Sequence, residues 1–201
     1  MKYQATVLLL AITSIAFAQQ KMRDDHSIPI PKLTFDANGE LVIKPSATSS
    51  STDFDFLVGK WKVGHEKLKE RLVNNNQWEE YETTQECFRI LEGLGNMDVA
   101  NAVLDGKPWE GRTIRLFNPK TNLWSLYWVS SNTGVMDPPV IGSFENDIGH
   151  FFTKDTFKGK PIIMMFRWDK RDKENSIWSQ AFSLDHGKTW EWNWYTSHRA
   201  K

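Results

Sequence analysis

From residue 53 onward, apolar and polar side chains alternate along the chain with a period of two. In the first such stretch Trp61, Val63 and His65 alternate with polar or small residues. This period is typical of a β-strand that buries one face. The stretch is followed by a longer alternating segment, 78–90. Eight further strands are predicted at 97–104, 111–117, 123–130, 140–145, 150–155, 161–169, 177–184 and 190–199.

The segments between these strands carry residues that favour chain reversal. Asp105-Gly106 and Asn118-Pro119 are two of them, and Asn146 to Gly149 and Lys158 to Lys160 are two more. Short strands joined by such turns predict an all-β fold, an antiparallel up-and-down meander of about ten strands. Closing the meander into a barrel would remove its exposed edges. A two-sheet sandwich is the alternative.

The first 18 residues have the pattern of a signal peptide. Lys2 precedes an apolar run from Ala5 to Ile15, and Ala16-Phe17-Ala18 offers small residues at the cleavage positions. Cleavage after Ala18 would place the mature chain outside the cytoplasm, secreted or periplasmic. The run is too short for a spanning helix, so no membrane span is predicted in the mature chain; a retained membrane anchor is the alternative.

Residues 19–52 are predicted to form a flexible N-terminal arm or linker before a barrel domain at 53–201. Ile28-Pro29-Ile30-Pro31 and the Ser/Thr-rich 46–52 are poor material for a packed core. Between them, 33–35 and 41–43 flank Asn38-Gly39, which predicts a small hairpin.

Composition narrows the function classes. The chain carries 25 basic and 25 acidic residues without a basic stripe, which argues against a nucleic-acid partner. Ten tryptophans suit either an aromatic core or a pocket that stacks on flat ligands. The single cysteine, Cys87, cannot form an internal disulfide, and we expect it to be a buried small hydrophobe rather than a reactive thiol.

The sequence motifs give little indication of catalytic or metal-binding chemistry. The five histidines are scattered without metal-binding spacing, so no metal site is predicted, and no nucleophile turn or phosphate loop is present. Residues 183–190 match one Asp-box, Ser-x-Asp-x-Gly-x-Thr-Trp. Sialidase-type propellers carry several copies, so a single copy predicts a stabilised turn.

Strand parity selects the candidate pocket residues. If Trp61 faces the interior, His65 does too, and Trp192, Trp194 and His198 share one face of the last strand. The first and last strands are neighbours in a closed meander, so both histidines could approach one cavity. The predicted ligand-binding residues are Trp61, His65, Trp128, Trp192, Trp194 and His198. The mid-strand charges of Glu86, Arg115 and Arg167 either line the pocket or face solvent.

The segment Phe54 to Trp61, with its Gly-x-Trp, together with the Trp-rich last strand resembles the calycin superfamily of lipocalins and their relatives, and in particular uncharacterised secreted bacterial lipocalin-like domains. The resemblance implies a barrel in which a basic residue of the last strand packs on Trp61. Arg199 alternates away from Trp192 and Trp194. Either a bulge resets the register, the Trp stripe lies outside, or the chain departs from the pattern here.

Nitrobindin-type haem proteins, one calycin-like branch, also begin with Gly-x-Trp and use a histidine near the C-terminus as the iron ligand. His198 has a comparable place, but residues 61–65 depart from the glycine-alternating stretch of that branch. No cofactor is therefore expected, with haem as the minor alternative.

The resulting hypothesis is a small-ligand-binding barrel whose partner is an apolar or aromatic molecule. A second hypothesis is an enzyme in which His65, Glu86 or His198 does acid–base work inside the barrel. A third is a structural or interaction module without a ligand.

Overall fold

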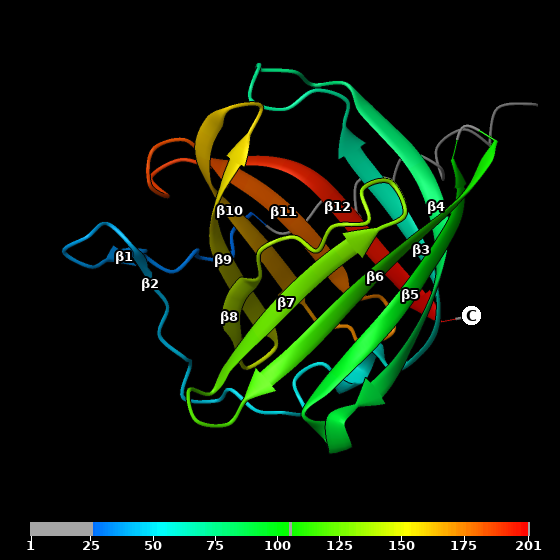
Figure 1. Ribbon diagram of the computed structural model, residues 1–201, viewed down its shortest axis with the longest axis horizontal. Helices are drawn as coiled ribbons and strands as arrows, with labels where there is room; N and C mark the ends of the chain where they lie inside the picture. The colour runs from blue at the N-terminus through cyan, green and yellow to red at the C-terminus, as the bar shows by residue number, and fades with distance from the viewer. Residues whose placement is uncertain (1–25, 105, 201) are drawn as a thin grey trace, which may run out of the picture.

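The computed structural model describes residues 26–104 and 106–200 (Figure 1). The predicted signal peptide lies outside the described residues. Ten antiparallel strands form a closed barrel, each paired with its neighbours in chain order, and the last strand returns to pair with the first. The strands are β3 (Gly59–Leu68), β4 (Trp78–Ile90), β5 (Gly95–Leu104), β6 (Lys107–Asn118), β7 (Leu123–Ser130), β8 (Val140–Glu145), β9 (Ile148–Phe157), β10 (Lys160–Asp169), β11 (Ile177–Ser183) and β12 (Glu191–Ala200).

This topology confirms the predicted all-β meander closed into a barrel, and it rules out the two-sheet sandwich that was the alternative. Among the described residues, no helix is long and apolar enough to cross a membrane. Closure is made by β12 on β3, where His198 pairs with Val63 and Thr196 pairs with His65. Paired residues of neighbouring strands point to the same side of a sheet, so these four side chains all face the interior.

A bulge in β12 changes which aromatic residues face inward. The consecutive β11 residues Gln180 and Ala181 pair with Trp194 and Trp192, so Asn193 is an extra residue without a partner of its own. The Gln180 amide donates a hydrogen bond to Asn193 Oδ1 at 2.8 Å and holds the bulge. Trp194 therefore faces the interior and Trp192 the outside, which makes the predicted inward position of Trp192 wrong.

One end of the barrel is closed by the segment that precedes β3. The short 3₁₀ helix η1 (Asp55–Leu57) carries Leu57 into the interior next to Phe54, and both are fully buried. Around them lies a core of apolar and aromatic side chains from five strands: Cys87, Trp124, Leu126, Val140, Phe144, Phe151 and Trp168. Cys87 is buried there, as predicted, and burial raises the pKa of its thiol to about 11.

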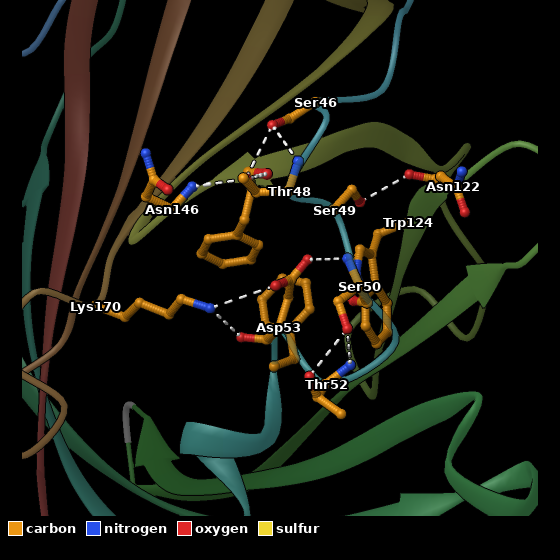
Figure 2. A network of polar contacts seen from close by, with 12 residues as sticks. Ser46, Thr48, Ser49, Ser50, Thr52, Asp53, Asn122, Trp124, Asn146 and Lys170 are labelled. Carbon is orange, nitrogen blue, oxygen red and sulfur yellow. Dashed lines mark hydrogen bonds and ion pairs between the residues drawn. The ribbon is translucent and has the colours of Figure 1, made fainter.

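Hydrogen bonds hold this closing segment to the barrel (Figure 2). Lys170 donates to the Asp53 carbonyl at 2.9 Å, and its ammonium lies 4.3 Å from the centre of the Phe144 ring. The Trp124 indole donates to the Ser50 carbonyl at 3.1 Å. These contacts hold the closing segment in the end of the barrel. They also give hydrogen-bond partners to backbone carbonyls that would otherwise be unsatisfied.

The arm packs against the outside of the barrel. Its predicted hairpin is present as β1 (Thr34–Phe35) and β2 (Leu41–Val42), which Figure 1 shows beside the barrel. Apolar arm residues cover an outer cluster made by strands β9 to β12. The cluster contains Phe152, Ile163, Met165 and Ala181, and it is covered by Ile30, Leu33, Phe35, Leu41 and Ile43 together with Trp190 and Trp192.

The Asp-box forms a turn between β11 and β12. Asp185 accepts hydrogen bonds from the Thr189 amide and hydroxyl at 2.8 and 2.7 Å, and the Gly187 amide donates to Ser183 Oγ at 2.8 Å. Gly187 has φ of +83°, a conformation that glycine adopts without strain. The predicted turn-stabilising role is confirmed.

Candidate functional site

The half of the barrel away from the closed end keeps accessible surface on its inner face. In β10 the inward-facing Met164 and Phe166 are only half-buried, whereas the outward-facing Ile163 and Met165 are fully buried beneath the arm. Side chains in the middle of a barrel strand retain inner surface only where the interior is not filled. The interior is therefore tightly packed near the closed end, and beyond it the inner face keeps accessible side-chain surface; this less filled half of the interior is called the hollow below.

Aromatic rings form one wall of this hollow. Phe166 contacts Trp178 with ring centroids 4.9 Å apart, and Trp178 contacts Trp194 at 5.5 Å. Trp194 is followed by His65 at 5.9 Å, which stacks on Tyr81 at 4.4 Å with an interplanar angle of 7°. All five rings are half-buried. They present a continuous, flat and mostly apolar surface from five strands.

The opposite wall carries Trp109 and Trp128, with ring centroids 6.0 Å apart. Both indoles lie over Gly111, where a Cβ atom would collide with them. The glycine is thus required by the close approach of the two rings.

His65 is held in one protonation state by its partners. The Trp194 indole, which can only donate, gives its hydrogen bond to His65 Nδ1 at 3.2 Å. Nε2 therefore carries the proton and donates to Thr83 Oγ1 at 2.9 Å. Burial, and then the nearby Lys67 cation, lower the pKa of His65 to about 3. The imidazole is a neutral, fixed part of the wall at neutral pH.

His198 lies at the floor of the hollow. It is 3% exposed, and its ring centroid lies 5.1 Å from that of Trp168 and 6.2 Å from that of Trp61. Burial, followed by the charge of Arg115, lowers the pKa of His198 to about 3. His198 is therefore the last-strand residue that packs on Trp61, the position that the calycin resemblance gave to a basic residue, while Arg199 is exposed outside.

A buried ion pair lies next to this floor. Arg115 and Asp98, 3% and 2% exposed, have a nitrogen–oxygen distance of 2.6 Å, and Arg115 also donates to Asn96 Oδ1 at 3.0 Å. The guanidinium lies 5.3 Å from the Phe54 ring centre and 5.7 Å from that of Trp168. Paired in this way, Arg115 and Asp98 place no net charge in the interior.

The other two charged candidates face outward. Glu86 is exposed and forms a surface ion pair with Lys60. Arg167 is buried outside the barrel, 4.3 Å from the Trp192 ring centre. Among the three, Arg115 alone points into the barrel.

The structure brings together five of the six predicted binding residues. His65, Trp128 and Trp194 line the hollow, Trp61 and His198 lie at its floor, and Trp192 is outside. Sequence reasoning missed five lining residues, although the period of two in their segments carried the signal: Tyr81, Trp109, Met164, Phe166 and Trp178. The fact that apolar residues occupy both faces of β10 hid which face was the inner one.

The enzyme candidates do not converge. The hydrogen-bond partners of His65 are an indole and a hydroxyl, and Glu86 lies on the other side of the wall. With pKa values of about 3, neither His65 nor His198 can exchange a proton readily near neutral pH. The described residues hold no group of three metal-ligating side chains.

Comparisons with known proteins do not identify a family for this chain. No protein-family model matches the chain, and no curated protein matches it. One solved structure that matches is titled "Crystal Structure of Rv2717c from M. tuberculosis". It is 14% identical, covers 78% of this chain and 99% of its own, and has a TM-score of 0.48. The barrel assignment therefore rests on the strand pairing described above.

Proposed function

We propose that this protein binds a small apolar or aromatic molecule in the hollow half of its barrel. The observation that carries the proposal is the burial pattern of β10, in which the inner Met164 and Phe166 keep accessible surface while the outer residues are covered. Concave sites lined by aromatic side chains with few polar groups are typical of small-molecule binding.

The wall chemistry supports a flat ligand. Phe166, Trp178 and Trp194 offer ring faces and edges on which an aromatic molecule can stack. Burying roughly 250 Å² of apolar ligand surface would contribute about 6 kcal/mol before the cost of lost freedom. This scale corresponds to micromolar or weaker binding for a ligand without polar contacts.

Two cationic side chains, Lys67 and Arg71, lie at the rim of the hollow. Lys67 lies 4.7 Å from the Trp194 ring centre, and Arg71 lies 5.6 to 5.8 Å from the rings of Phe182, Trp194 and Phe157. These side chains hold their charge over aromatic faces, so a ligand enters past a positive, aromatic rim.

A haem is not supported by the residues around His198. Trp61 and Trp168 contact its imidazole from two strands, and the Arg115–Asp98 pair lies beside it. A porphyrin bound to His198 would have to displace these packed rings, so the residues around His198 do not fit a haem. An ultraviolet–visible scan of protein purified from its own host tests this directly.

We also propose that the barrel acts outside the cytoplasm, after cleavage behind Ala18. The support is the sequence pattern of residues 1–18. N-terminal sequencing of the protein recovered from its host should begin at Gln19; an intact Met1 would contradict export by cleavage.

The proposed binding is tested with N-phenyl-1-naphthylamine, a neutral probe whose fluorescence rises in apolar surroundings. The protein should enhance probe fluorescence saturably, and Trp fluorescence should change with the same midpoint. Native mass spectrometry of host-purified protein would reveal a co-purified small molecule. A probe that shows no saturable signal, together with a side-chain-filled interior in a crystal structure, would contradict the proposal.

A further inference from the structure

The floor of the hollow carries buried polar atoms without a hydrogen-bond partner. Four of them are Trp168 Nε1, Arg115 Nε, Thr196 Oγ1 and His198 Nδ1, whose residues are 3 to 6% exposed; a fifth, the acceptor Asp98 Oδ2, lies 2.6 Å from an Arg115 nitrogen in the buried ion pair. Such atoms are uncommon in folded proteins, because an unmet hydrogen bond in a buried site costs about 1–3 kcal/mol. Four of them in one region point to a group that the site is built to receive.

These four residues lie in one region of the interior. The Trp168 ring contacts both His198 and Arg115, with centroid distances of 5.1 and 5.7 Å, and Thr196 precedes His198 by two positions on the same inner face. Lining residues of the hollow border them. Phe166 precedes Trp168 by two positions on the same face of β10, and Thr196 pairs side by side with His65 and Trp178.

All four atoms can donate a hydrogen bond, so a hydrogen-bond acceptor would satisfy them. Indole Nε1 and guanidinium Nε can only donate, so Trp168 and Arg115 cannot satisfy each other. The Thr196 hydroxyl can donate as well, and so can His198 Nδ1 in one tautomer. An oxygen atom with two lone pairs would meet at least two of these donors.

The charge at the floor excludes an anion. Arg115 is already paired with Asp98 at 2.6 Å, so a second carboxylate would be buried near the first without a cation of its own. The lowered pKa values of His198 and His65 leave both imidazoles neutral. The acceptor that fits is uncharged.

We infer that the ligand carries a neutral oxygen acceptor, such as a carbonyl, bound at the floor by hydrogen bonds from Trp168 and Arg115, with its apolar or aromatic body against the rings above. This inference rests on the proposed function and names the chemical class of the ligand. Thr196 and His198 complete the polar floor.

Two probes of equal carbon skeleton test it by isothermal titration calorimetry: 2-acetylnaphthalene, and 2-ethylnaphthalene, in which a methylene replaces the carbonyl. The wild-type protein should bind the ketone roughly tenfold more tightly, since the hydrocarbon leaves the floor donors unpaired. Trp168→Phe keeps an aromatic ring but removes the donor, and should bring the two affinities close together. Thr196→Val, which is nearly isosteric, should reduce the preference to a smaller extent.

Trp178→Phe is the matched control, because it alters an indole of the wall rather than of the floor; it should weaken both probes and preserve their ratio. Equal affinities of the two probes in the wild type would overturn the inference and leave the proposed function standing, because water would then satisfy the floor donors. Failure of both probes to bind would overturn the proposed function itself. The anionic 2-naphthoate should bind more weakly than the ketone, and tighter binding would overturn the neutral acceptor.

Discussion

The Trp194 indole donates a hydrogen bond to His65 Nδ1 across the seam where β12 closes on β3. The bond exists because the Asn193 bulge turns Trp194 inward while Trp192 stays outside. It fixes the His65 tautomer, aligns an aromatic wall and joins the first strand to the last. Barrel closure and the candidate pocket thus depend on the same two side chains.

Stability should fall when the pH drops below about 6.5. His65, His150 and His198 have pKa values lowered to about 3 by burial, against 6.5 in the unfolded chain. The unfolded state therefore binds more protons between these values, and each histidine removes about 1.4 kcal/mol of stability per pH unit in that window. Urea unfolding at pH 7.5, 5.5 and 4.5 measures the loss.

The same histidines can be followed one by one. Imidazole proton resonances of the folded protein should show all three rings still neutral at pH 5. His65→Gln should reduce the slope of stability against pH between 6.5 and 4.5. A resonance from any of the three that titrates near pH 6.5 would contradict the burial described for that residue.

Breaking the buried ion pair should be costly. Asp98→Asn leaves the Arg115 charge buried without its partner, and we expect a loss of about 3–5 kcal/mol in the free energy of unfolding. Glu86→Gln is the control, because its pair with Lys60 is exposed and its nitrogen–oxygen distance is 3.7 Å; it should change stability by less than about 1 kcal/mol. Similar losses in the two variants would show that the Arg115 site is solvated.

The Asp-box should matter for stability and not for binding. Asp185→Ala removes the acceptor of both Thr189 hydrogen bonds, which also hold the pKa of Asp185 at about 2. The variant should melt at a lower temperature and bind N-phenyl-1-naphthylamine as the wild type does. Lys188→Ala, an exposed change in the same turn, should leave the melting temperature near its original value. A weakened probe affinity in Asp185→Ala would instead tie this turn to the hollow.

The sequence alone predicted the strands well, because their period of two and their turn residues are local signals. Strand bounds at 123–130 and 140–145 agree with β7 and β8. The sequence could not show where, within a strand, the inward-facing positions change from one alternating set of residues to the other. The phase of Arg199 made a bulge one of the alternatives, but no residue near Asn193 marks its position, so Trp192 and Trp194 are predicted on the same side.

The sequence pattern also did not reveal that the arm covers part of the outer face of the barrel. The arm covers the outer surface of β9 to β12, so β10 is apolar on both faces and its alternation no longer reveals the interior. Tyr81 pairs with His65, and the Trp178 ring contacts that of Trp194, relationships that only the strand register reveals. Long-range pairing, not local pattern, decides which aromatic residues meet.

The central claim, a ligand site inside the barrel, is tested most directly by a matched pair of tryptophan variants. Trp194→Ala removes an inner ring of the hollow, and Trp192→Ala removes an outer ring beneath the arm. Titration with N-phenyl-1-naphthylamine should show an affinity about fivefold weaker or worse for Trp194→Ala, and one close to wild type for Trp192→Ala. A larger loss in Trp192→Ala than in Trp194→Ala would contradict the interior site.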